Sequence, residues 1–475
     1  MTEKFEPLQL EDMQGLLARG YGKLPHACFV LMAFGSRDGA RAWLHEFMPN
    51  ITPASVRAEK VTMNLAFTHL GLSQFELDEA TLNSFPRELS EGMTAPHRQR
   101  ILGDIGESAP ECWQWGGPSN PKIHAALFIY ACTSAQLDEA YEKAIESFKA
   151  HSITAIKRLD TTELTDREHF GFRDGISQPI VPGLPKRDLP INTVPAGEFF
   201  LGYKNAYGKM PDSPGISGGR RLPKYKPREP QQDLGRNGSY VVFRQLEQDV
   251  AQFWRFMLAH AETNESAIRL ASKMVGRWPS GAPLAQSPEK DNPAMAEANT
   301  FGYVAQDADG LACPFGAHIR RTNPRDALEE TEVKMAVDIV NRHRILRRGR
   351  SYGPPLVASL NPHEMIAALQ AGDKDTQDAG ERRGLMFICL NANIQRQFEF
   401  IQHTWCNNPK FETLYDEVDS ISGAAKEGEA NNFSVPGMPA RERVSAVPRF
   451  VTVRGGAYFF MPGMAALHIL ASKRL

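Results

Sequence analysis

His26-Ala-Cys-Phe-Val-Leu-Met-Ala-Phe34 is an almost continuous apolar run, and it predicts a buried strand. Apolar residues at helical spacing follow it, at Ala40, Trp43, Leu44 and Phe47. The same order recurs downstream, where the strand candidate Ser239-Tyr-Val-Val-Phe-Arg244 precedes the helical spacing of Val250, Phe253, Trp254 and Met257. The chain therefore contains two similar strand–helix units, one beginning at His26 and the other at Ser239.

A second pair of segments repeats this pattern. Residues 123–131 (IHAALFIYA) and 384–390 (GLMFICL) each predict a strand, and a helical pattern follows both. Each half then begins and ends with a strand–helix unit, which is typical of a duplicated α+β domain with helices covering one face of a sheet. Residues 204–237, rich in Gly, Pro, Lys and Arg, indicate an extended connection. We place the two domains at 1–230 and 231–475.

Composition excludes several classes of protein. Over 475 residues, 54 Lys and Arg against 56 Asp and Glu give a formal net charge of −2, which argues against a general nucleic-acid binder. The mean hydropathy is −0.38, and no apolar run approaches the roughly 20 residues of a membrane span. The first residues, MTEKFEPLQLEDMQ, lack the apolar stretch of a signal peptide. Six scattered cysteines without CxxC or CxxCH exclude covalent c-type haem attachment and favour a reducing cytoplasm.

One acidic residue stands in an unusual setting in the first half. Asp174 lies within His169-Phe-Gly-Phe-Arg-Asp-Gly-Ile-Ser-Gln-Pro179, flanked by aromatic and apolar residues. Partial desolvation there would suit a carboxylate to proton transfer, whereas the alternative is a surface Asp-Gly turn. The short pattern G-x-x-D-G also fits Gly35 to Gly39, and spacing alone does not choose between Asp38 and Asp174.

The second half offers a histidine and a basic run. His318 follows a turn in the segment 313–325, where a neutral imidazole would ligate a metal, although a structural histidine is the commoner role. Six basic side chains in 341–352 predict either a solvated face or a phosphate-binding patch. Ile345 and Leu346 interrupt that run and indicate a buried strand, on which Arg347 and Arg348 would point to opposite faces.

Together these segments resemble the dye-decolorizing haem peroxidases. The matching stretches are GFRDGISQP (171–179), CPFGAHIRRTNPR (313–325) and RHRILRRGRSYG (342–353), supported by GEFFLGY (197–203), GRWPSGAPL (276–284), RQFEFIQHTW (396–405) and GGAYFFMPGM (455–464). The resemblance covers most of the chain from about Tyr21 onward and is to the longer, non-exported members. It implies an α+β fold of two ferredoxin-like domains, of the dimeric α+β barrel type, with non-covalently bound haem b between them.

The resemblance also implies residue roles. Asp174, which Ser-Gln-Pro follows, matches the family's distal acid–base; Arg347 matches the distal arginine and His318 the axial iron ligand. Arg321 would contact a haem propionate, with a surface arginine as the alternative. The expected activity reduces hydrogen peroxide and oxidises dyes or phenolics by one-electron steps, in a soluble protein that binds neither nucleic acid nor membrane and for which a homo-oligomer is left open. The alternatives are a haem-binding or haem-iron-releasing (deferrochelatase-like) protein and a duplicated binding module without haem.

One position departs from the family pattern. Family members generally have a carboxylate hydrogen-bonded to the axial histidine, from the last strand–helix unit of the second domain. Here that region contains Asn393 near the expected place and Glu399 about a turn and a half further on, and whether one of these or another residue plays the role stays open. Trp278, Trp405 and Tyr352 are candidates for electron relay, and none is assigned.

Overall fold

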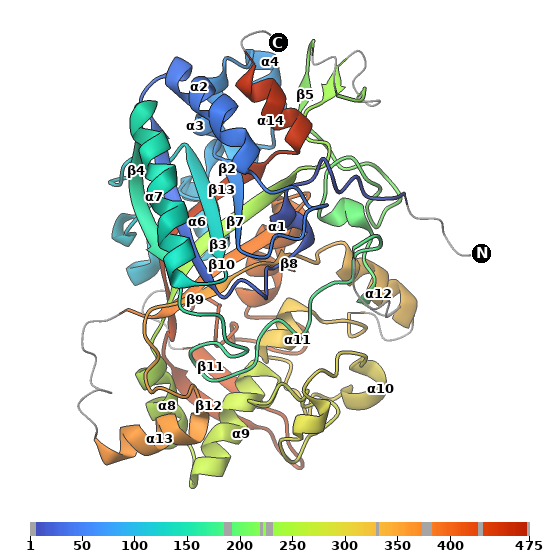
Figure 1. Ribbon diagram of the computed structural model, residues 1–475. Helices are drawn as coiled ribbons and strands as arrows, with labels where there is room; N and C mark the ends of the chain where they lie inside the picture. Colours follow the sequence, from blue (N-terminus) through green and yellow to red (C-terminus); the bar gives the residue numbers. More distant parts are fainter. Residues whose placement is uncertain are drawn as a thin grey trace.

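One antiparallel sheet of nine strands organises the chain (Figure 1). The computed structural model describes residues 6–184, 192–218, 222–224, 231–328, 332–372, 382–425 and 431–472. Within these ranges the strand order is β4-β1-β3-β2-β13-β7-β10-β8, and β9 also pairs with β10.

The first half forms one end of this sheet. Its strands are β1 (His26–Phe34), β2 (Val61–Phe67), β3 (Ala125–Ala131) and β4 (Ile153–Asp160). Helix α2 (Arg37–Phe47) follows β1 and helix α7 (Ser134–Ala150) follows β3, as the apolar spacing predicts. Two antiparallel strand–helix units with the order β4-β1-β3-β2 make a ferredoxin-like arrangement.

The second half repeats that order. Its strands are β7 (Ser239–Gln248), the short β8 (Leu346–Arg347) and β9 (Arg350–Tyr352), β10 (Gly384–Asn391) and β13 (Val451–Met461). Read as β13-β7-β10-β8, they take the places of β4, β1, β3 and β2. Helix α8 (Val250–Ala259) follows β7. The two π-helical segments η10 (Gln395–Glu399) and η11 (Ile401–Cys406) follow β10, where a helix was expected. The predicted α+β class with two ferredoxin-like units is confirmed.

The two units meet edge to edge. Phe67 of β2 pairs with Phe460 of β13, so one sheet runs through both halves. The proposed boundary at residue 230 stays a prediction, because residues 219–221 and 225–230 of the expected connection lie outside the described residues. Its described parts contain only the small hairpin of β5 (Gly215–Ile216) and β6 (Gln232–Asp233).

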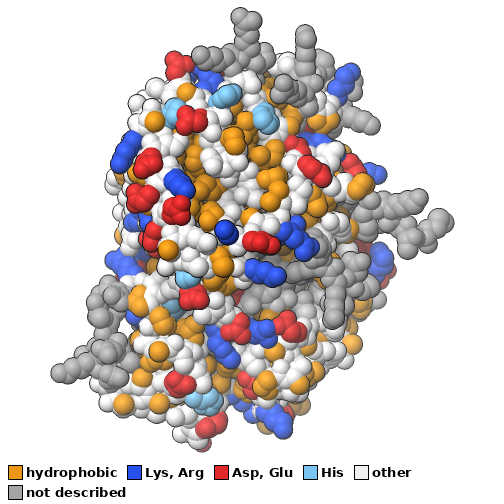
Figure 2. Space-filling view, viewed as in Figure 1, with side chains coloured by type: hydrophobic (Ala, Val, Ile, Leu, Met, Phe, Trp, Pro, Cys, Tyr) orange, Lys and Arg blue, Asp and Glu red, His pale blue; other side chains and the backbone are white. Residues whose placement is uncertain are grey.

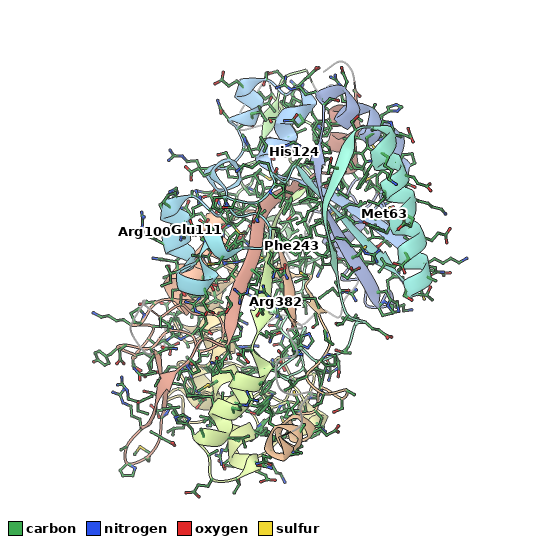
Figure 3. The ribbon with its side chains drawn as sticks, turned by 90° about the vertical axis from the view of Figure 1, so that its left-hand side faces the viewer. Met63, Arg100, Glu111, His124, Phe243 and Arg382 are labelled. Carbon is green, nitrogen blue, oxygen red and sulfur yellow. The ribbon has the colours of Figure 1, made fainter. Side chains whose placement is uncertain are left out.

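Alternating side chains give the sheet two apolar faces. Cys28, Val30 and Met32 of β1 pack with residues of α2, α7 and α14 (Met464–Ala471). Phe29 packs on the opposite face with Phe243 of β7 (Figure 3). The two ends of the sheet approach each other on that side, since the Thr162 amide after β4 donates to the Ser351 oxygen of β9 at 2.9 Å.

The remaining elements lie mainly in connections between these strands. Helices α8, α9 (Asn264–Val275) and α13 (Pro362–Ala371) gather below the sheet in Figure 1 around a separate apolar cluster. Shorter elements are α1 (Gly15–Ala18), α3 (His69–Leu72), α4 (Glu79–Leu82), α5 (Arg87–Glu91), α6 (Pro96–Leu102), α10 (Val304–Asp307), α11 (His318–Thr322), α12 (Val333–Asn341), β11 (Asn431–Val435) and β12 (Glu442–Val447).

The surface and the helices agree with the composition. Basic and acidic side chains are interspersed on the face shown in Figure 2, as a net charge of −2 would suggest. Over the part of the chain that the structure describes, each helix is too short or too polar to cross a lipid bilayer.

A buried charge network ties α6 to the two last strand–helix units. Both carboxylate oxygens of Glu399 accept hydrogen bonds of 2.8 Å from Arg98 Nη1, and Tyr458 Oη of β13 donates to the same carboxylate at 2.8 Å. The side chains of Arg98 and Glu399 are only 7% and 2% exposed, so neither charge has water as a substitute partner. Removing one charge from such a pair leaves the other buried and uncompensated.

Glu399→Gln is therefore expected to lower the free energy of unfolding by about 2 kcal/mol, because Arg98 would lose its buried counter-charge and keep only Glu91 as an acidic partner. Urea denaturation followed by circular dichroism measures this. The matched control is Glu139→Gln on α7, whose pair with Lys143 is exposed, so its stability should stay close to that of the wild type. Equal losses in both variants would contradict the assigned role of the network.

Candidate functional site

A cavity of about 300 Å³ is lined by strand residues of the second half of the sheet and by residues of α11 and η11. Asp174, His318 and Arg347, which come from three distant segments, all contribute to its lining. Apolar side chains form much of the remaining wall, among them Phe170, Phe172, Leu246, Ile319, Leu385 and Phe387. Its size and its mixture of apolar walls with a few polar groups are typical of a cofactor or small-molecule site.

The loop that carries Asp174 is held by its own polar groups. The Asp174 amide donates to the Asp166 oxygen at 3.1 Å, which closes the loop. Inside it, the Glu168 carboxylate accepts from the amides of Phe170 and Phe172, both at 2.9 Å. Gly175 has a φ of 82°, a conformation that a residue with a Cβ rarely adopts, and its amide donates to Asp174 Oδ1 at 2.6 Å. This local folding directs Asp174 to the cavity.

Arg347 reaches the cavity from β8, which pairs with β10. Its neighbours on either side, Leu346 and Arg348, lie on the other face: Leu346 is buried in the apolar cluster there, and Arg348 donates to the main-chain oxygens of Leu16 and Leu17. The alternation of side chains along a strand thus separates the two adjacent arginines.

Asp174 and Arg347 form an ion pair within the cavity. Arg347 Nη1 donates to Asp174 Oδ1 at 2.7 Å, and the 43% exposure of the Asp174 side chain is toward the cavity that it lines. Burial works to raise the pKa of Asp174, but the Arg347 charge and the Gly175 amide outweigh it, so the pKa lies below the usual aspartate value. Asp174 is therefore a carboxylate over most of the pH range.

Gln178 connects these two segments and was missed by the sequence reasoning. Its side-chain oxygen accepts from the Arg347 amide at 3.0 Å, and its side-chain nitrogen donates to the Arg347 carbonyl at 3.2 Å. The amide side chain thereby pairs with Arg347 as a neighbouring strand would. The Ser-Gln-Pro that follows Asp174 was the available signal, since it lies within the same segment.

His318 stands at the start of α11 and is oriented by a buried carboxylate. Its Nδ1 lies 2.9 Å from Asp419 Oδ2, and the Asp419 side chain is wholly buried. Asp419 Oδ1 accepts from the amides of Ile421 and Ser422, both at 2.8 Å. With Nδ1–H donating to the carboxylate, Nε2 is the ring atom available to a metal.

The electrostatics of this pair favour the charged forms. Burial works to lower the pKa of His318, but the Asp419 carboxylate outweighs it and holds the pKa above the usual histidine value. Burial likewise works to raise the pKa of Asp419, and His318 together with the backbone donors lowers it overall. A histidine with such a partner is a more basic ligand than an isolated imidazole.

Asp419 replaces both residues considered for this position. Asn393 caps the following segment by accepting from the Arg396 amide at 2.8 Å, and Glu399 belongs to the network with Arg98. Asp419 lies beyond both π-helical segments, in a stretch without regular secondary structure, where no periodic pattern could single it out. The closest signal was Asp-Ser-Ile-Ser, a sequence suited to the Asx-type turn that it forms.

Arg321 does not contribute to the cavity lining, contrary to the expected propionate contact. It is fully buried, and its guanidinium donates to the main-chain oxygens of Trp405, Asn408 and Glu417. It therefore supports the segment that leads to Asp419. The physical reason is that three unpaired carbonyls lie around it, which a buried guanidinium satisfies better than solvent would.

Arg344 instead presents a charge to the cavity. Its Nη2 donates to the Ser177 carbonyl at 3.0 Å, and among the described residues no carboxylate lies within ion-pair distance of it. Burial lowers its pKa to about 9. A buried arginine without a carboxylate partner is suited to an anionic group of a ligand.

The structure separates the two GxxDG segments. Asp38 lies on the surface at the start of α2, with 92% of its side chain exposed, and pairs with Arg41 of the same helix. Trp278, Trp405 and Tyr352 are all buried, so none of these relay candidates reaches the surface. Among the described residues, no group of three or more His, Cys, Asp or Glu side chains could hold a bare metal ion.

Several known dye-decolorizing peroxidases are similar to this chain in sequence and in fold. It is 30% identical to the dye-decolorizing peroxidase msp1 of Mycetinis scorodonius, over 98% of this chain and 88% of that protein. It is 29% identical to the multifunctional dye peroxidase DyP2 of an Amycolatopsis species, over 99% and 96%. A solved structure of a dye-decolorizing peroxidase in complex with 2,6-dimethoxyphenol has a TM-score of 0.78 and 26% identity, and the match covers 98% of this chain and 100% of that one.

A partial match to a second kind of protein was also found. A deferrochelatase of Yersinia pestis is 26% identical, but over 50% of this chain and 36% of that protein. No family model matches the chain. Because the 30% identity to msp1 extends over nearly all of both proteins, the chain belongs to the dye-decolorizing peroxidase family.

Proposed function

We propose that the protein is a haem b peroxidase that reduces hydrogen peroxide and oxidises dyes, phenolics or similar organic donors in one-electron steps. One observation carries this proposal. A histidine backed by a buried carboxylate, His318 with Asp419, lines the same cavity as the ion pair of Asp174 and Arg347.

The residues present fit a non-covalently held haem. His318 offers one axial nitrogen, and a porphyrin would supply the other four donors that the surrounding side chains do not. Phe172, Leu385 and Phe387 provide apolar walls for a planar macrocycle. Arg344 supplies the positive charge for a propionate, in place of Arg321. When bound, haem iron provides the position at which hydrogen peroxide is activated and the store for its oxidising equivalents.

The chain's own residues handle protons and charge. Asp174, held as a carboxylate by Arg347, takes a proton from one oxygen of hydrogen peroxide and returns it to the other oxygen, which leaves as water. Arg347 stabilises the negative charge that builds on the departing oxygen. Gln178 keeps both groups in register by fixing the Arg347 main chain. Asp419 keeps His318 in the tautomer that presents Nε2.

The haem-iron-releasing alternative rests on a relative that matches only half of this chain. A haem-free binding module would not need a carboxylate-backed histidine in a cavity. The cytoplasmic location stays a prediction, and whether the protein forms a homo-oligomer stays open.

His318→Ala is expected to abolish the haem absorption band of the purified protein, because the axial nitrogen is lost. Asp419→Asn should weaken haem binding by about 10- to 100-fold, as the supporting charge is removed while the shape is kept. Haem titration followed by absorption spectroscopy measures both. The control is Asn393→Ala, which removes the alternative candidate and should bind haem like the wild type; if it behaved like Asp419→Asn, the assignment of Asp419 would be wrong.

Asp174→Asn should slow the reaction with hydrogen peroxide by about 10²–10³-fold while haem stays bound, because an amide cannot accept the proton. Stopped-flow absorption after mixing with peroxide gives the rate. Asp38→Asn changes the same GxxDG pattern on the surface and should leave that rate unaltered. A full peroxide rate in Asp174→Asn would contradict the proposed acid–base role.

The acid limit of the peroxide reaction should depend on Arg347. Asp174 must be ionised, so the rate falls only as pH drops through its pKa, which lies below the usual aspartate value. Arg347→Leu removes the charge that lowers this pKa and leaves the burial that raises it, so the acid limb should move to higher pH. Arg347→Lys keeps a charge and should stay near the wild-type limb. A pH–rate profile with unchanged limbs in all three proteins would exclude this coupling.

A further inference from the structure

A second polar region lines the cavity apart from Asp174 and Arg347. It consists of Asp104, Ser108, Arg244 and Arg449, and is called here the Arg449 end. These residues come from the segment after α6, from β7, and from the connection between β12 and β13. The reaction steps derived above use none of them.

Arg449 has no acidic partner at this end. Its Nη1 donates to the Ser108 hydroxyl at 2.6 Å, and among the described residues no carboxylate lies within ion-pair distance of its guanidinium. The nearby Asp104 is engaged by Arg244 in a buried ion pair, with the two side chains 2% and 4% exposed. Burial lowers the pKa of Arg449, although the side chain stays cationic near neutral pH. Arg449 is thus a cation without a directly paired carboxylate, although Asp104 and Glu107 lie near enough to act on its charge.

Ser108 adds a second donor. Its oxygen accepts from Arg449 Nη1 and also from the Val453 amide at 3.0 Å, so both lone pairs are occupied. The hydroxyl hydrogen then has no acceptor among the described residues, although Ser108 is wholly buried and lines the cavity. A half-buried guanidinium and a buried hydroxyl with a free hydrogen together call for an acceptor that carries negative charge.

Apolar side chains surround this donor pair. Leu102 lines the cavity beside it, and Leu246 and Val453 lie opposite each other on β7 and β13. Phe398 lies under the Arg244 guanidinium, with 5.9 Å between the guanidinium carbon and the ring centre. An acidic oxygen at Arg449 would therefore be joined most favourably to an aromatic ring, which these walls accommodate.

We infer that the Arg449 end binds the carboxylate or sulfonate of an aromatic electron donor, through Arg449 and Ser108. The inference rests on the proposed function, because it names a substrate class for the same cavity. It also separates two anion positions: Arg344 for a propionate of the cofactor and Arg449 for the acid group of the reductant.

Equilibrium binding tests the inference without turnover. Benzoate titrated into the haem-loaded protein by calorimetry, with no peroxide, should bind about tenfold more weakly to Arg449→Gln than to the wild type, because a charge-assisted hydrogen bond is lost. Arg449→Lys keeps the charge and should restore most of the affinity, which guards against a general folding defect. Arg100→Gln, on the exposed side of α6 (Figure 3), is the matched control and should bind like the wild type. Equal benzoate affinity in Arg449→Gln and the wild type would overturn the inference.

Turnover gives a second readout. With saturating peroxide, the KM for syringate divided by the KM for its uncharged methyl ester should rise about tenfold in Arg449→Gln. An unchanged ratio would overturn the inference. So would a haem affinity that falls in Arg449→Gln as far as the benzoate affinity, because Arg449 would then hold the cofactor's own carboxylate.

Failure of the proposed function looks different. If the haem-loaded wild type oxidised neither syringate nor its ester with peroxide, the peroxidase proposal would fail, while benzoate calorimetry would still decide whether Arg449 binds an aromatic acid.

Discussion

The contact between Asp174 and Arg347 is the constraint on which the site depends, because it joins two segments that are 173 residues apart in the chain. Arg347 can reach Asp174 only if the short strand β8 takes the place in the second unit that β2 holds in the first. Gln178 then pairs with the Arg347 main chain as a strand edge would and locks the loop of the first half to that position. The duplicated fold therefore does more than enclose a cavity: it brings the carboxylate of one half to the guanidinium of the other.

The part of the cavity at His318 depends on charges that are buried and matched. His318 is oriented by Asp419, and Arg321 holds the carbonyls of the segment that leads to Asp419. Such groups stabilise the fold only while each keeps its partner. Several arginines that line the cavity, namely Arg277, Arg325, Arg344 and Arg449, donate to main-chain or neutral side-chain oxygens rather than to carboxylates. We assign two of these arginines to anionic groups: Arg344 to a propionate of the cofactor and Arg449 to the acid group of the substrate.

Much of this was predictable from the sequence, for identifiable reasons. The strands around Phe29 and Val241 are long and apolar, and the helices after them have regular spacing, so periodicity alone located them. Asp174, His318 and Arg347 stand in segments that resemble a known family. Asp419 could not be found in this way, because it lies in an irregular stretch and acts through a contact with a residue 101 positions away. Arg321 was expected at the cofactor because a sequence does not show which carbonyls will surround a guanidinium.

The most direct measurement is a crystal structure of the protein grown with haem. The account predicts iron bonded to Nε2 of His318, Asp419 hydrogen-bonded to the other ring nitrogen, and Asp174 still paired with Arg347 in the same cavity. Iron bonded to another residue, or haem bound outside this cavity, would contradict it.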